Sequence, residues 1–227
     1  MHVLVACEYS GTVRDAFKEA GHFAVSCDLL PTDVPGKHYQ GDVTDILGDG
    51  WDLMIAHPPC TFLSVSGMHW TTRGMRDQNL TEEALNFVKV LMNAPIPKIC
   101  IENPISVIST RIIEPTQIIQ PWMFGDDASK ATSLWLKCLP ELRPTKIVPP
   151  RLVCCGLGIP EGCGAYGCPN CLGQKRAKER WANQTDSGQN KLPPTKDRWK
   201  ERSKTFAGIA QAMAAQWSDI KQMELYQ

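Results

Sequence analysis

The sequence HPPCT at residues 57–61 directly follows the short apolar run LMIA at 53–56. The apolar run is typical of a buried strand, which must end at the prolines because proline has no N–H to donate to a sheet. The chain therefore turns and presents Cys60 at the carboxyl end of the strand, where ligands bind in open α/β sheets. A cysteine held on such a turn is a candidate nucleophile, although most isolated cysteines are buried and structural.

A second strand-like run, ICIENP at 99–104, ends in an acid, an amide and a proline. Upstream of both, residues 3–7 read as a buried strand, followed by a turn, a helix from Thr12 to Ala20 and a strand that ends at Asp28. This order predicts the first βαβ unit of a Rossmann-like sheet. Only one glycine, Gly11, occupies the turn, so the sequence favours a cofactor without phosphate groups.

The two strand ends, Pro-Pro-Cys60 and Glu102-Asn-Pro, resemble motifs IV and VI of the DNA cytosine-C5 methyltransferases, and GDVTDI at 41–46 resembles motif III. The resemblance implies an α/β, Rossmann-like fold of the S-adenosylmethionine-dependent methyltransferases. It also implies that Cys60 attacks C6 of cytosine and that Glu102 holds the ring at N3. Asn103 would shape the catalytic pocket.

The same resemblance implies S-adenosylmethionine as cofactor and assigns residues to its parts. Asp42 and Val43 would lie against the adenine and Asp28 near the ribose, and Leu29 and Pro58 are further predicted cofactor-binding residues. The methionine part would lie near the turn after the first strand, formed by Glu8, Tyr9, Ser10 and Gly11. Motif I departs from the family pattern Phe-x-Gly-x-Gly, since only Gly11 is retained.

Residues 124–136 lie where the family has motif VIII, and Lys130 stands in the place of its first arginine. A lysine supplies one charged hydrogen bond to cytosine O2 instead of the two-pronged contact of arginine. Residues 203–214 resemble motif X, a turn and helix that return to the cofactor pocket. The resemblance covers most of residues 1–145 and resumes at 203–217.

Residues 61–75 are polar and mixed, and in the family this stretch is a mobile loop that closes over the substrate. Its side chains are candidate contacts to a nucleic-acid backbone or ordinary loop residues, and the sequence leaves both open: Ser64, Ser66, His69, Trp70, Arg73 and Arg76. The helix that opens at Thr81 carries an apolar stripe, which is typical of core packing.

Five cysteines fall within a short stretch rich in glycine and proline: Cys154, Cys155, Cys163, Cys168 and Cys171. The last two form a CxxC pair, and four thiolates would make a closed, structural zinc site, with either Cys154 or Cys155 as one ligand. Unmetallated buried thiols and a redox CxxC are the alternatives. Residues 172–204 then carry ten Lys or Arg against four Asp or Glu, with Trp181 and Trp199 between them, which favours a nucleic-acid contact.

The chain has 227 residues, of which 43% are hydrophobic and 21% charged, and its formal net charge is zero. Such a composition predicts one globular α/β domain with a small appendage and no global attraction to nucleic acid. The expected organisation is a catalytic core at 1–145, a Cys-rich basic recognition element at 146–202 and a returning helix at 203–227. No stretch resembles a signal peptide or a membrane span, so we expect a cytoplasmic protein with reduced cysteines.

The sequence therefore predicts an enzyme that transfers a methyl group from S-adenosylmethionine to C5 of cytosine in DNA, most readily double-stranded DNA. No membrane and no obligate protein partner is expected. Two alternatives stay open: the same chemistry on RNA, single-stranded DNA or a free cytidine nucleotide, and a non-catalytic, zinc-bearing nucleic-acid-binding protein on the same fold.

Overall fold

The computed structural model describes residues 1–153 and 178–218 of the chain. Within them, the chain divides into two compact units. Unit 1 comprises residues 1–119, 131–143 and 205–218, and unit 2 comprises residues 120–130, 144–153 and 178–204. The five candidate zinc ligands lie outside the described residues.

Unit 1 is built on a seven-stranded sheet in the order β3-β2-β1-β4-β5-β7-β6. All neighbouring pairs from β3 to β5 are parallel, and β7 runs antiparallel to both β5 and β6. The strands are β1 (His2–Ala6), β2 (Phe23–Asp28), β3 (His38–Gln40), β4 (Leu53–Ala56), β5 (Lys98–Pro104), β6 (Gln117–Ile119) and β7 (Thr132–Lys137). This sheet confirms the Rossmann-like α/β fold class predicted from the sequence. The chain reverses its winding direction between β1 and β4, and open α/β sheets bind ligands at such a point.

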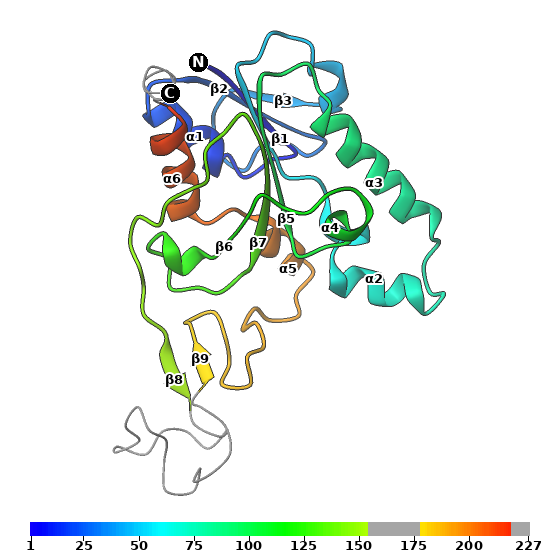
Figure 1. The fold of residues 1–227 in the computed structure, drawn as a ribbon, viewed down its shortest axis with the longest axis vertical. Helices are drawn as coiled ribbons and strands as arrows, with labels where there is room; N and C mark the ends of the chain where they lie inside the picture. Colours follow the sequence, from blue (N-terminus) through cyan, green and yellow to red (C-terminus); the bar gives the residue numbers. More distant parts are fainter. Residues whose placement is uncertain (154–177, 219–227) are drawn as a thin grey trace, which may run out of the picture. The chain divides into compact units, whose positions relative to one another are not determined.

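Helices cover both faces of the sheet (Figure 1). On one side, α1 (Thr12–Glu19) and α6 (Ala207–Trp217) lie together, and on the other side lies α3 (Asn79–Met92). Alternate strand residues such as Leu4, Met54 and Ile101 form one buried cluster with the apolar stripe of α3. The central strands are apolar on both faces because helices bury both of them.

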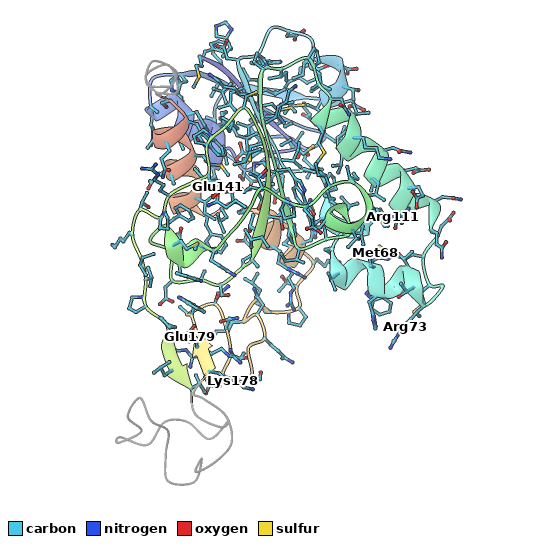
Figure 2. The ribbon with its side chains drawn as sticks, in the orientation of Figure 1. Met68, Arg73, Arg111, Glu141, Lys178 and Glu179 are labelled. Atoms are coloured by element: carbon cyan, nitrogen blue, oxygen red, sulfur yellow. The ribbon has the colours of Figure 1, made fainter. Side chains whose placement is uncertain are left out.

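The segment after Cys60 differs from the predicted loop. Residues Cys60–Phe62 form a 3-10 turn, and Val65–Thr72 form helix α2. The helix begins where the Ser64 hydroxyl accepts a hydrogen bond from the N–H of Gly67 at 3.2 Å, an N-cap that the polar composition concealed. Met68 on α2 lies toward the fold, and Arg73, which directly follows α2, extends away from it (Figure 2).

The remaining short elements of unit 1 connect the strands. A 3-10 turn at Val43–Asp45 follows β3, and α4 (Ile108–Arg111) follows β5. Within residues 1–153 and 178–218, no helix combines the length and the apolar character needed to cross a membrane.

Unit 2 contains a 3-10 turn at Pro121–Met123, the antiparallel pair β8 (Arg151–Val153) and β9 (Lys178–Arg180), and α5 (Arg198–Ser203). β9 carries Lys178 and Glu179, labelled in Figure 2. The rings of Trp122 and Trp181 stack with centroids 5.4 Å apart, and Trp181 is buried. Trp181 is therefore a core residue of unit 2, whereas Trp199 is exposed, and the predicted nucleic-acid contact of residues 172–204 stays a prediction.

Candidate active site

The two strand ends singled out in the sequence lie on neighbouring strands. β4 and β5 pair in parallel, with Ala56 opposite Ile101. One residue further along each strand, this register brings His57 opposite Glu102. The Pro-Pro-Cys60 turn therefore lies beside Glu102, Asn103 and Pro104, the last three residues of β5, at the carboxyl edge of the parallel strands.

Direct hydrogen bonds join the Pro-Pro-Cys60 segment to the end of β5 and to the residues that follow it. The side-chain amide of Asn103 donates from Nδ2 to the carbonyl oxygen of Pro58 at 2.8 Å, and Asn103 is buried. Further along, the N–H of Val107 donates to the carbonyl of Leu63 at 2.9 Å. Asn103 thus fixes the backbone two residues before Cys60, which is a positioning role consistent with its predicted place in the pocket.

The carboxyl group of Glu102 contacts a residue that the sequence analysis did not assign. Nδ1 of His57 lies 3.0 Å from Oε2 of Glu102, and both side chains are about nine-tenths buried. A buried carboxyl group needs such a partner, because an isolated buried charge is costly. The signal in the sequence was the equal offset of His57 and Glu102 from the ends of two adjacent apolar runs.

A cavity of about 190 Å³ opens beside the Pro-Pro-Cys60 turn. Four residues predicted to bind the cofactor line it: Asp28, Leu29, Asp42 and Val43. The wall also includes Gly41, Pro59, Phe87, Cys7 and Cys27, so the cavity reaches the residue that precedes Cys60. Phe87 belongs to α3, to which the sequence analysis assigned only a core role.

The two carboxylates in the wall differ in their electrostatics. Burial raises the pKa of Asp28, partly offset by the N–H of Leu30, which donates to its Oδ1 at 2.9 Å. Asp42 accepts at Oδ1 from both the N–H and the hydroxyl of Thr44, and these bonds lower its pKa. Asp28 is therefore a desolvated hydrogen-bond acceptor inside the cavity, whereas Asp42 is a well-stabilised anion at its margin.

Two thiols complete the wall. Burial raises the pKa of Cys27 to about 12, and burial also raises the pKa of Cys7. Both side chains therefore remain neutral at physiological pH and contribute small, weakly polar surface. Cys7 has a positive φ of 59°, a conformation that is uncommon outside glycine and that ends β1 in a sharp turn.

The predicted methionine-binding turn, residues 8–11, is organised around Glu8. Oε1 of Glu8 accepts from the N–H of Val13 at 2.7 Å, and Oε2 accepts from the N–H of Arg14 at 3.2 Å. Glu8 therefore caps α1 with both oxygens, and the Ser10 hydroxyl also donates to Oε1. Tyr9 is buried and Gly11 has a positive φ of 75° at the start of α1. None of the four belongs to the described lining of the cavity, so their contact with a cofactor stays a prediction.

A buried arginine holds the loop that follows Asp28. Arg14 is 1% exposed and donates to the hydroxyls of Ser26 and Thr32 at 3.1 and 3.2 Å. It also pairs with Asp15 at 2.8 Å. Arg14 thereby anchors the loop that follows Asp28, which is a cavity residue. Its place in an amphipathic helix did not indicate this role.

Lys130 and the candidate zinc ligands are the remaining site residues predicted from the sequence. Lys130 belongs to unit 2, where its Nζ donates to the carbonyl of Arg202 at 3.0 Å. Its predicted contact with cytosine stays a prediction. Among residues 1–153 and 178–218, no three His, Cys, Asp or Glu side chains are grouped as metal ligands.

No protein-family model matches the chain, and no curated protein matches it. Solved structures do match, among them a prophage-encoded protein of E. coli described as a candidate DNA modification methyltransferase. The identity is 14% and the TM-score 0.44, over 66% of this chain and 52% of that chain. The chain thus spans about half the length of that structure, and a likeness at this level carries no argument about activity.

Proposed function

We propose that the protein transfers a methyl group from S-adenosylmethionine to C5 of cytosine in DNA. The observation that carries this proposal is the Asn103–Pro58 hydrogen bond of 2.8 Å, which joins the Glu-Asn-Pro end of β5 to the Pro-Pro-Cys turn. It holds a thiol and a carboxyl group on adjacent strand ends, beside a cavity that reaches Pro59. Covalent attack on a pyrimidine needs such a nucleophile and acid in proximity.

The cavity residues suit the adenosine part of S-adenosylmethionine. Val43, Pro59 and Phe87 offer apolar surface for a flat base, and the Asp28 carboxylate offers an acceptor for ribose hydroxyls. When bound, S-adenosylmethionine supplies an electrophilic methyl group on a positively charged sulfur. The Asp28 and Asp42 carboxylates favour such a cation electrostatically.

The chemistry of the chain's own residues follows from cytosine. C5 of the base is a weak nucleophile, so it must first gain electron density. The Cys60 thiolate forms a bond to C6, the C5=C6 double bond opens, and Glu102 gives a proton to N3. The electron density then resides at C5, which can take the methyl group. A base such as water then removes the C5 proton, and its electron pair restores the C5=C6 double bond and releases Cys60 as a thiolate. In a duplex the target base must leave the stack, at a cost of about a few kcal/mol.

The proposal is tested by incubating the full chain with duplex DNA and S-adenosylmethionine carrying a labelled methyl group, followed by nucleoside analysis. We expect 5-methylcytosine from the wild type and none above background from Cys60→Ser. Cys138→Ser is the matched control, because Cys138 is an exposed cysteine at the end of β7 and should leave the rate unchanged.

Glu102→Gln should reduce the rate about 10²- to 10⁴-fold, the usual effect of removing a general acid. Label transferred to an adenine or to the cytosine amino group would contradict the proposed reaction. Label transferred to RNA, single-stranded DNA or a cytidine nucleotide in preference to duplex DNA would move the proposal to that substrate.

A further inference from the structure

The His57–Glu102 pair gives the site a feature that the Pro-Pro-Cys and Glu-Asn-Pro motifs do not explain. Nδ1 of His57 lies 3.0 Å from Oε2 of Glu102, and the His57 side chain is 9% exposed. The other ring nitrogen, Nε2, is buried and has no hydrogen-bond partner among the described residues. A buried polar atom of this kind calls for an explanation, and buried polar groups concentrate near functional sites.

The two nitrogens together indicate where the ring carries its proton. If Nε2 carried it, a buried N–H would be left without an acceptor, which destabilises that tautomer. With the proton on Nδ1, the ring donates to the Glu102 carboxyl group and Nε2 presents only a lone pair. Nδ1–H is therefore the favoured donor, and Oε2 the acceptor.

We propose that His57 is a positioning residue for Glu102, donating from Nδ1–H to Oε2 so that Oε1 is the oxygen that meets N3 of cytosine. This inference rests on the proposed function and deepens it. Lys130, the cationic residue assigned to the base by resemblance, bonds through Nζ to the carbonyl of Arg202. His57 is a basic side chain that lies within hydrogen-bond distance of Glu102 in the structure.

The proton balance assigns His57 a role in the reaction as well as in the fold. When Cys60 bonds to C6, the Oε1–H bond of Glu102 breaks and an N3–H bond forms. The resulting negative charge of the carboxylate is shared by Oε2, where the Nδ1–H of His57 is already in place to stabilise it. The proton returns to Oε1 when the product is released, so His57 neither gains nor loses a proton during the cycle. Preorganised donors of this kind stabilise developing charge without reorganisation.

Three substitutions separate this role from simple packing. His57→Asn places an amide N–H near the position of Nδ1, His57→Gln places one near Nε2, and His57→Ala removes both. We expect His57→Ala to lose about 10- to 100-fold in kcat, the usual effect of a misplaced catalytic group, with the Kd for S-adenosylmethionine unchanged. His57→Asn should recover most of the loss and His57→Gln should not. Thermal unfolding of each variant shows whether it is folded.

A second readout isolates the first chemical step. Addition of Cys60 to C6 makes C5 basic, so hydrogen at C5 exchanges with solvent even without methyl transfer. Exchange from DNA labelled with tritium at C5 should follow the same order, with wild type and His57→Asn fast and His57→Ala and His57→Gln slow. Wild-type kcat in His57→Ala, or equal rates in the Asn and Gln variants, would overturn the proposal.

The pair can also be observed independently of activity. In ¹⁵N NMR spectra of the wild type, His57 should show the Nδ1–H tautomer, and Glu102→Gln should weaken this preference. If the wild type methylates no cytosine substrate, the proposed function fails, and the NMR result still decides whether His57 donates to Glu102. A His57 ring protonated on Nε2 alone would contradict the inference in either case.

Discussion

At the scale of single residues, the Asp28 carboxylate lowers the stability of the folded protein but favours ligand binding. Its carboxylate is desolvated in the cavity wall, and burial raises its pKa above the ordinary value of 3.8. The cost of keeping this charge is offset when a ligand hydroxyl donates to it. The Asp28 carboxylate is therefore more favourable in the protein with bound ligand than in the protein without it.

We expect Asp28→Asn to raise the free energy of unfolding at pH 7, by less than about 1 kcal/mol because water partly screens the group. A raised pKa means that the folded state holds the proton more tightly, so the stability from this group is present below pH 3.8 and is lost as pH rises. The gain in the variant should therefore shrink as pH is lowered toward that value. Urea unfolding at several pH values measures it.

The same substitution should weaken S-adenosylmethionine binding about 10- to 100-fold, because it removes a charged hydrogen-bond acceptor. Asp42→Asn is the control, because its expected effect on stability is opposite to that of Asp28→Asn. Thr44 lowers the pKa of Asp42, so its replacement should reduce stability at pH 7. Equal effects of the two substitutions on stability would contradict this account of the cavity.

At the scale of the elements, α2 packs against the turn that carries Cys60. Gly67 lies in the first turn of α2, and a Cβ atom added there would lie 2.1 Å from the carbonyl oxygen of Thr61. Thr61 directly follows Cys60, so the close approach of the helix helps to define the position of Cys60. This oxygen belongs to the backbone, which cannot move aside as the end of a flexible side chain can.

Helix propensity alone would favour alanine over glycine at position 67 by about 1 kcal/mol. The clash with the Thr61 carbonyl outweighs this difference in propensity, so we expect Gly67→Ala to destabilise the protein by about 1–3 kcal/mol. It should also lower kcat by displacing Cys60. Gly48→Ala is the matched control, since its Cβ would meet nothing within 4 Å. A Gly67→Ala variant as stable and active as Gly48→Ala would refute the packing argument.

At the scale of the whole molecule, the sequence predicted strands β1, β2, β4 and β5 because they are short apolar runs, and it did not predict the three-residue strands β3 and β6. It also predicted that Cys60, Glu102 and Asp28 lie at strand ends, since parallel strands present their carboxyl ends on one edge, whereas Asp42 was assigned only by resemblance. What it could not predict came from contacts distant in sequence. The stacking of Trp122 on Trp181 is of this kind, as are the anchoring of a loop by Arg14 and the partnership of His57 with Glu102.

A ligand that binds only the folded state should stabilise unit 1 through the cavity. S-adenosylmethionine at 100 times its Kd should raise the free energy of unfolding by about 2.7 kcal/mol. Hydrogen exchange should slow most at the ends of β1 and β2 and at residues 41–46, which bear the cavity wall. Protection confined to residues 178–204 of unit 2 would show that the cofactor binds elsewhere.

The central claim is that Cys60 attacks C6 of cytosine, and a duplex carrying 5-fluorocytosine tests it most directly. Fluorine at C5 cannot leave as a proton does, so after methyl transfer the bond between Cys60 and C6 persists. We expect mass spectrometry to find one covalent DNA adduct in the presence of S-adenosylmethionine, on the peptide that contains Cys60, and none in Cys60→Ser. An adduct on another cysteine, or no adduct from a wild type that binds the cofactor, would contradict the account.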